Sequence, residues 1–252
     1  MKKYFKIVVL FLLYFIFFQT AVFPQIFLTT NNYSENILEN GIKVFILEDF
    51  SIPTINVKYT VSAGFSAQNK NNTGFFKLYS KLFKTGYTEE ENLENLNFSE
   101  ECNSDISAYS MTVTPISLEK SLENLAKHAF NSSFTDKNIK AELDLMKNEV
   151  MQYSSTPASF INAGIDSRIF SSEPWKFDSG IYPALFSKTT PSQARTILEE
   201  IAKKFYTPQN SCIFISGCVK KEAALELIEK TFGIYKRSAV SQKAAPPKIG
   251  NE

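Results

Sequence analysis

The sequence contains a single histidine and three cysteines among 252 residues. One imidazole cannot supply the two or more nitrogen ligands of a typical zinc site, and three thiols without a Cys-x-x-Cys spacing do not form a disulfide framework. Cys212 and Cys218 lie in one expected strand, where the rise per residue separates them by about 20 Å, so they cannot form a disulfide with each other. All three cysteines are therefore expected to be small core residues.

An excess of either charge is also absent. The chain has 27 Lys and Arg against 26 Asp and Glu, and the part expected to fold contains no basic block. Nucleic-acid binding needs a concentrated positive surface, so DNA and RNA are not expected as partners. The composition is 44% hydrophobic and 14% aromatic, with 23 phenylalanines, which is enough for a sizeable core without a metal or a disulfide.

The N-terminus has the pattern of an export signal. Three lysines among the first six residues precede an uninterrupted apolar run from Ile7 to Phe18, and smaller or polar residues follow up to Gln25. The run is shorter than the roughly 20 residues that span a bilayer. We expect residues 1–25 to be a signal peptide and the mature protein to be periplasmic or extracellular, with a membrane anchor only if this segment stays uncleaved.

Hydrophobic periodicity predicts an α+β chain. Strands are expected over 41–47, 55–64, 106–116 and 212–216, and helices over 74–86, 118–131, 137–152, 192–205 and 221–232. Four prolines mark 154–192 as loop and short helix, and the small, proline-containing tail 239–252 as a linker or disordered end. We predict one domain over 26–238, with a mixed or antiparallel sheet covered on one face by the helices at 118–131, 137–152 and 221–232.

Four segments in this order share the motifs of a known family. They are ENGIKVFILED with SIPTINVKYTVSAGFSAQ, then NNTGFFKLYSKLFKTG, IKAELDLMKNEV and FYTPQNSCIFISGCVKKEAALELIEKTFG. Together they resemble the insulinase-like zinc peptidases, also called the M16 or pitrilysin family. The resemblance implies a single M16-type domain, the metallopeptidase fold called LuxS/MPP-like, of the N-terminal type.

The same resemblance implies that the zinc motif is degenerate. Active relatives carry Gly-x-x-His-x-x-Glu-His, which supplies two zinc ligands and a general base, and a distant glutamate supplies the third ligand. Here Lys77 and Lys81 replace the histidines, Ser80 replaces the glutamate, and the third ligand falls on Glu142. An ammonium has no lone pair, two of them repel a divalent cation, and serine is a poor base. We therefore expect no zinc, no other cofactor and no catalytic residue.

Two interpretations of these positions stay open. In one, Lys77, Ser80 and Lys81 form a solvated helix face without a role. In the other, an ammonium stands where the charge of the metal was and forms an ion pair with Glu142 or Glu149, which holds two helices together. The only histidine, His128, is expected beside the apolar stripe of its helix, as a flanking residue rather than a ligand.

The resemblance favours a non-catalytic protein of the family. M16 peptidases are usually built from two or more homologous domains, one of which commonly lacks the zinc motif, so we expect a heterodimer with another M16-like subunit, or self-association. Phe-rich segments at 75–83 and 160–186 are expected to leave an apolar surface for that contact. An extended peptide could also add to 106–116 as an edge strand. The alternative is an active zinc-dependent endopeptidase of the family with an unrecognised site.

Overall fold

The computed structural model describes residues 33–91, 97–152, 156–171, 174–177, 185 and 188–238. The predicted signal peptide at 1–25 and the predicted tail at 239–252 lie outside the described residues. In the described ranges no helix is both long enough and apolar enough to cross a membrane.

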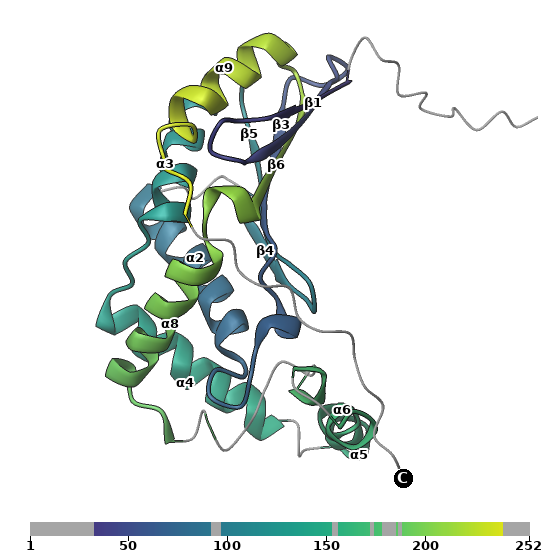
Figure 1. Ribbon diagram of the computed structural model, residues 1–252, viewed down its shortest axis with the longest axis vertical. Coiled ribbons are helices and arrows are strands. Elements are labelled where there is room, and N and C mark those ends of the chain that lie inside the picture. The colour runs from purple at the N-terminus through teal and green to yellow at the C-terminus, as the bar shows by residue number, and fades with distance from the viewer. Residues whose placement is uncertain are drawn as a thin grey trace, which may run out of the picture. The chain divides into compact units, whose positions relative to one another are not determined.

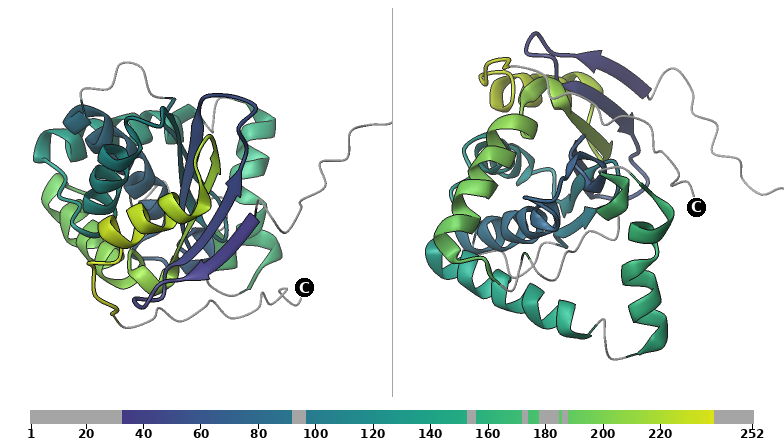
Figure 2. Two further views of the ribbon diagram at one scale, coloured as in Figure 1. Left: turned by 90° about the horizontal axis from the view of Figure 1, so that it is seen from above. Right: turned by 60° about the horizontal axis from the view of Figure 1, so that its bottom comes forward.

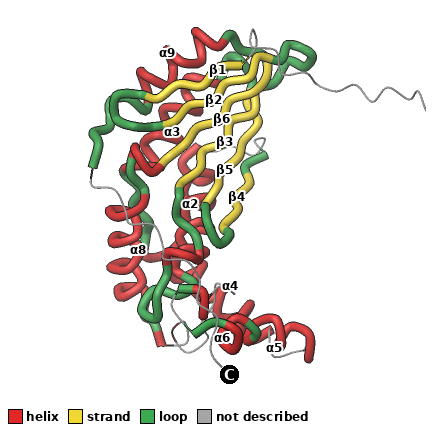
Figure 3. The backbone as a smooth tube through the Cα atoms, turned by 45° about the vertical axis from the view of Figure 1, so that its right-hand side comes forward, coloured by secondary structure: helices red, strands yellow, loops and turns green. Residues whose placement is uncertain are grey.

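Six strands of the described chain form one mixed sheet, in the order β1-β2-β6-β3-β5-β4 (Figure 3). They are β1 (Tyr33–Ile37), β2 (Lys43–Glu48), β3 (Ile55–Val61), β4 (Ser99–Cys102), β5 (Ser107–Val113) and β6 (Ser211–Gly217). β2 and β6 are parallel, whereas every other neighbouring pair is antiparallel. The predicted α+β class with a mixed sheet is confirmed.

Side-chain alternation gives the sheet one buried face and one open face. In β3, Val57, Tyr59 and Val61 are buried, and the residues between them are exposed or half-buried. A strand directs successive side chains to opposite faces, so this pattern places the core on one side only. We call the other side the open face.

Long helices pack against the buried face. The long ones are α2 (Phe75–Glu91), α3 (Leu118–Phe130), α4 (Asp136–Gln152), α8 (Pro191–Phe205) and α9 (Lys221–Thr231); short ones are η1 (Phe65–Ala67), α5 (Pro157–Gly164), α6 (Asp166–Ile169), η2 (Trp175–Phe177) and η3 (Pro208–Asn210). In Figures 1 and 2, α2, α3 and α9 lie on one side of the sheet. α4 contacts α2 and α8. The expectation that the helix at 137–152 covers the sheet is therefore wrong, because α2 lies between.

α2 is apolar over most of its circumference because it has neighbours on two sides. Phe83 stacks on Tyr109 of β5 with 3.8 Å between ring centroids, and Tyr79 packs on Tyr206 at 4.1 Å. Phe75 and Phe76 are buried as well. The expectation that the Phe-rich segment 75–83 forms a docking surface is therefore wrong, since these rings fill the core. Most of the other Phe-rich segment, 160–186, lies outside the described residues.

Two strands and one helix end differ from the prediction. β1 and β4 were not expected, and α2 continues through Gly86 to Glu91. β4 reads SEEC, and two adjacent acidic residues give no strand signal. Because β4 pairs with β5, the segment at 106–116 is an inner strand, and the expectation that it forms the edge is wrong.

Gly86 lies within α2 for a packing reason. A Cβ at this position would lie 2.8 Å from Nε2 of His128, so only glycine leaves room for the imidazole. His128 is 4% exposed and meets the rings of Phe83 and Tyr87 edge-on, at 5.0 and 5.9 Å. It is therefore a core residue between α2 and α3, and the expectation of a flanking histidine is wrong.

Candidate functional site

α2 and α4 bring two lysines and one glutamate together. Lys77 and Lys81 are one helical turn apart on the outer face of α2. Nζ of Lys77 lies 3.1 Å from Oε2 of Glu149 on α4, and Nζ of Lys81 lies 2.5 Å from Oε1 of the same carboxylate. The two side chains of α2 are 29% and 22% exposed and that of Glu149 is 35% exposed. We call this arrangement, Lys77–Glu149–Lys81, the lysine clamp.

The lysine clamp keeps Glu149 ionised. Partial burial alone would raise the pKa of Glu149, but hydrogen bonds from Lys81 and Lys77 and the charges of both ammonium groups outweigh it, and the net pKa is lowered. Charge-assisted hydrogen bonds of this kind are about twice as strong as neutral ones. The clamp therefore links α2 to α4 through a carboxylate that stays charged at neutral pH.

Glu142 does not take part in the clamp. Its Oε1 accepts a hydrogen bond of 2.8 Å from Thr85 Oγ1, two turns from Lys77 on α2. The two helices run in opposite directions, since residues later in α2 meet residues earlier in α4. Glu142 and Glu149 share a face of α4 but are separated by about 10 Å along it. The carboxylate that faces positions 77 and 81 is thus Glu149.

Ser80 is not on the exposed face with the two lysines. It is 1% exposed, and its hydroxyl has no hydrogen-bond partner of normal geometry among the described residues. The hydroxyl lies close to Tyr109, whose pKa burial raises well above its usual value. A serine in this position, directed into the core, has neither the basicity nor the access to activate a water molecule.

The described residues do not fit a zinc ion. Lys77 and Lys81, which the family resemblance aligns with two nitrogen ligands, present ammonium groups here, and no group of three His, Cys, Asp or Glu side chains in the described ranges could hold a metal. Cys102 lies at the neighbouring edge strand, where burial raises the pKa of its thiol to about 11. Cys102 does not belong to any group of three possible metal ligands in the described part of the chain.

Comparison with known proteins assigns the fold. The sequence model of the family described as "Peptidase M16 inactive domain" matches residues 194–251. A peptidase M16 inactive domain from Pseudomonas fluorescens superposes with a TM-score of 0.75 at 16% identity, over 86% of this chain and 54% of that one. A protease from Helicobacter pylori gives 0.73 at 16% identity, over 86% and 53%. The chain thus has the M16 peptidase fold, and the predicted resemblance is confirmed.

A curated relative agrees with this assignment. The "Uncharacterized zinc protease YmfH" of Bacillus subtilis (strain 168) is 25% identical over 116 residues, which are 46% of this chain and 26% of that protein. The first half of the periplasmic protease PqqL from Escherichia coli superposes with a TM-score of 0.71 at 14% identity, over 86% of this chain and 49% of that one. The chain spans about a quarter of the curated relative and about half of each of these solved chains.

Proposed function

We propose that this protein is a non-catalytic M16 peptidase-like protein that acts as a partner subunit of an M16 assembly. The observation that carries the proposal is the lysine clamp: two ammonium groups, at the positions that the family resemblance aligns with two zinc ligands, pair with the carboxylate of Glu149. The clamp supplies a fixed link between α2 and α4 without a metal. Ser80, at the position that the resemblance aligns with the general base of active relatives, is buried.

The partner role is supported by the open face of the sheet and by the greater length of the relatives. This chain covers 53% and 54% of two solved relatives, so each of them contains a further region about as large as the matched one. On the open face, Phe214 is 41% exposed and stacks on Phe45 at 5.0 Å, and Phe45 stacks on Tyr33 at 6.5 Å. Three aromatic rings in a row on an uncovered sheet face are typical of a surface that meets another protein.

Export belongs to the same proposal. The lysines and the apolar run of residues 1–25 support transport out of the cytoplasm, and the partner would then occupy the same compartment. Among the described strands β4 forms one edge of the sheet, and an extended peptide would add there. The alternative of an active endopeptidase would need a set of zinc ligands, and no group of three His, Cys, Asp or Glu side chains in the described ranges could hold a metal ion.

Site-specific crosslinking tests the association. We expect a photoreactive phenylalanine analogue at position 214 to crosslink, in the native envelope, to an M16-like chain or to a second copy of this chain, because a specific interface covers about 1,000 Å² or more. The same analogue at Ile116, which is 96% exposed in the turn before α3, is the matched control and should give no such product. Crosslinked chains are identified by mass spectrometry.

Two outcomes would contradict the proposal in different ways. Equal crosslinking from positions 214 and 116 would show that the open face is not the specific contact surface. The role as a partner subunit would be contradicted by two results together. These are a monodisperse monomer in light scattering at tens of micromolar, and no crosslink to an M16-like chain from either position.

A further inference from the structure

One end of the sheet carries two neighbouring turns with exposed apolar side chains. The turns are 49–54, which joins β2 to β3, and 114–117, which joins β5 to α3. β3 begins at Ile55 and pairs there with Val113, the last residue of β5, so both turns leave the sheet at the same end (Figure 3). We call them the apolar turns.

The exposed residues of the apolar turns are largely hydrophobic. Ile116 is 96% exposed, and Phe50 and Ile52 are 52% and 51% exposed. Pro53 and Pro115 are exposed as well. Single exposed apolar residues are common on protein surfaces, but a group of them marks a place that contacts a membrane, another protein or a ligand.

Backbone hydrogen bonds hold the apolar turns in place, so the exposed side chains cannot fold back into the core without breaking them. The bonds run from the N–H of Asp49 to the carbonyl oxygen of Gly217 at 2.9 Å, from Cys218 to Thr54 at 3.0 Å and from Ser117 to Thr114 at 3.1 Å. Because the turns are already ordered, contact with another surface costs little conformational entropy.

Charged groups beside the first apolar turn have partners of their own. Lys220 Nζ lies 3.5 Å from Oε2 of Glu48 and 4.8 Å from the centre of the Phe50 ring. The carboxylate of Asp49 accepts a hydrogen bond of 2.9 Å from the N–H of Ser51. An apolar ring with an ammonium group at its margin suits the boundary between the acyl chains and the headgroups of a bilayer.

The folded domain begins at this same end of the sheet. β1 starts at Tyr33, which pairs with Leu47 next to the last residue of β2. Only residues 19–32 separate Tyr33 from the apolar run 7–18. A fully extended chain of this length spans at most about 50 Å, so a run that stays uncleaved in a bilayer keeps Tyr33 within that distance of the membrane. This position makes a lipid surface the fitting occupant of the apolar turns.

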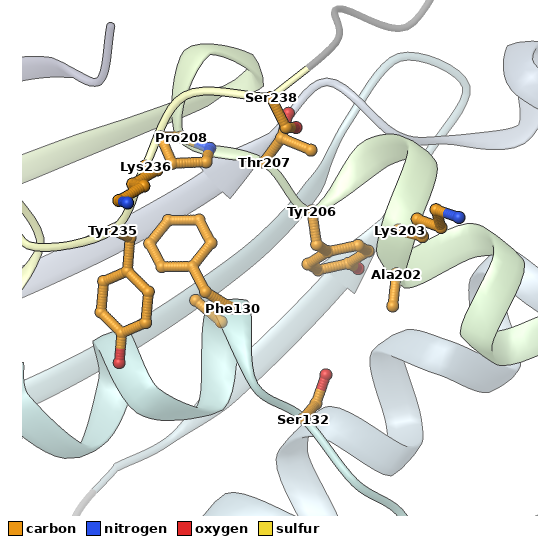
Figure 4. Close-up of a pocket in the computed structure, with 11 residues that line it drawn as sticks. Phe130, Ser132, Ala202, Lys203, Tyr206, Thr207, Pro208, Tyr235, Lys236 and Ser238 are labelled. Atoms are coloured by element: carbon orange, nitrogen blue, oxygen red, sulfur yellow. The ribbon is translucent and has the colours of Figure 1, made fainter. Parts of the chain in front are cut away.

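The opposite end of the sheet is more polar. There Asn40, in the turn between β1 and β2, donates a hydrogen bond of 2.9 Å to the carbonyl oxygen of Tyr235. Figure 4 shows this region: the rings of Phe130 and Tyr235 pack together, and the ammonium groups of Lys203 and Lys236 point away from them. The two ends of the domain thus differ in the chemistry that they present.

Two isoleucines are exposed at the opposite end as well. Ile37 is 66% exposed and pairs across the sheet with Lys43. Ile234 is 71% exposed and lies two residues before Lys236. Each has a lysine close by, so these residues are controls for the exposure of an isoleucine alone.

We propose that the apolar turns rest on the surface of the membrane that the exported protein faces, with Phe50, Ile52 and Ile116 at the boundary between headgroups and acyl chains. The insertion of a few apolar side chains is weak, so this contact orients a chain that is already near the bilayer. The inference relies on export, which is part of the proposed function, but it does not involve a partner subunit.

Fluorescence quenching in vesicles tests the proposal. The full chain is reconstituted in phosphatidylcholine vesicles with brominated acyl chains, and the signal of Trp175 in the unchanged protein is subtracted. Relative to vesicles without bromine, Ile116→Trp should lose at least about half of its added fluorescence, because bromine quenches indoles that reach the acyl chains. Ile234→Trp is the matched control and should lose less than about a tenth.

Further variants test whether the two turns act together. Adding Phe50→Ser/Ile52→Ser to Ile116→Trp should reduce the quenching at least twofold, whereas adding Ile37→Ser should leave it unchanged. All these side chains are exposed, so serine removes no core contact.

Three results would overturn the proposal. They are quenching at position 234 that equals or exceeds quenching at position 116, no quenching at position 116, and a dimer without vesicles that Ile116→Ser dissociates. The last result would assign the apolar turns to a second copy of the chain. No M16-like partner is present in these experiments, so their failure is distinct from a failure of the proposed function.

Discussion

The double variant Lys77→His/Lys81→His is expected to bind one zinc ion per chain with a dissociation constant in the micromolar range or tighter, whereas the unchanged protein should show no measurable zinc binding. Both positions are one turn apart on α2 and face the carboxylate of Glu149, so the variant presents two imidazoles and one carboxylate, the ligand set of many catalytic zinc sites. Titration followed by elemental analysis measures the gain.

A second substitution in the same variant identifies the third ligand. Glu149→Gln should abolish the new zinc binding, and Glu142→Gln should leave it within about threefold, because Glu142 is held by Thr85 away from positions 77 and 81. Loss of zinc on Glu142→Gln alone would mean that the contacts between α2 and α4 are different from those described. The double variant is not expected to cleave peptides, since Ser80 supplies no base.

Removal of the charge on Glu149 should lower the free energy of unfolding. Glu149→Gln takes one carboxylate from between two ammonium groups that are each about a quarter exposed, and it leaves the two like charges one turn apart. Because solvent screens half-buried pairs, we expect a loss of about 1–2 kcal/mol at neutral pH rather than the larger loss of a fully buried pair. Urea unfolding measures the difference.

The pH dependence of this loss follows from the lowered pKa of Glu149. A carboxylate with a lowered pKa in the folded state stabilises the protein fully above its unfolded value, about 4.5, and this contribution disappears as the pH falls through the lower folded value. The difference between the unchanged protein and Glu149→Gln should therefore be constant from neutral pH down to about 5 and shrink below about 4.5. A difference that grows on acidification would contradict the clamp.

Asp144→Asn is the matched control on the same helix. Asp144 pairs with Lys140 on α4, but these side chains are 50% and 70% exposed, so solvent screens the pair and we expect a much smaller loss of stability than for Glu149→Gln. If Asp144→Asn lowered the free energy of unfolding as much as Glu149→Gln does, any acidic residue on α4 would have the same effect. This result would contradict a specific role of the lysine clamp.

The helices and strands with a strong hydrophobic periodicity were predictable from the sequence. β3 alternates buried and exposed residues, and α3 has a clear apolar stripe, so their residue ranges differ from the structure by only a few positions. β4 is short, acidic and at an edge, where little burial is needed, and it leaves no such signal. The apolar stripe of a helix also does not indicate which element the helix packs against. For this reason α4 was expected to pack on the sheet, although it packs on α2 and α8.

The candidate site was predictable only in part for a similar reason. The motif alignment pointed to Lys77 and Lys81, because the motif places both positions at a fixed sequence distance from the glycine that precedes the helix. The choice between Glu142 and Glu149 depends on how two antiparallel helices are aligned, and no local pattern contains that alignment.

The zinc content of the purified protein tests the central claim most directly. The protein is incubated with excess zinc, dialysed without chelator and examined by elemental analysis alongside Lys77→His/Lys81→His as the positive control. Since the lysine clamp offers a metal two ammonium groups and one carboxylate, the unchanged protein should retain less than about 0.1 zinc per chain. A zinc content of one per chain that survives dialysis would contradict the account of a non-catalytic M16-type domain.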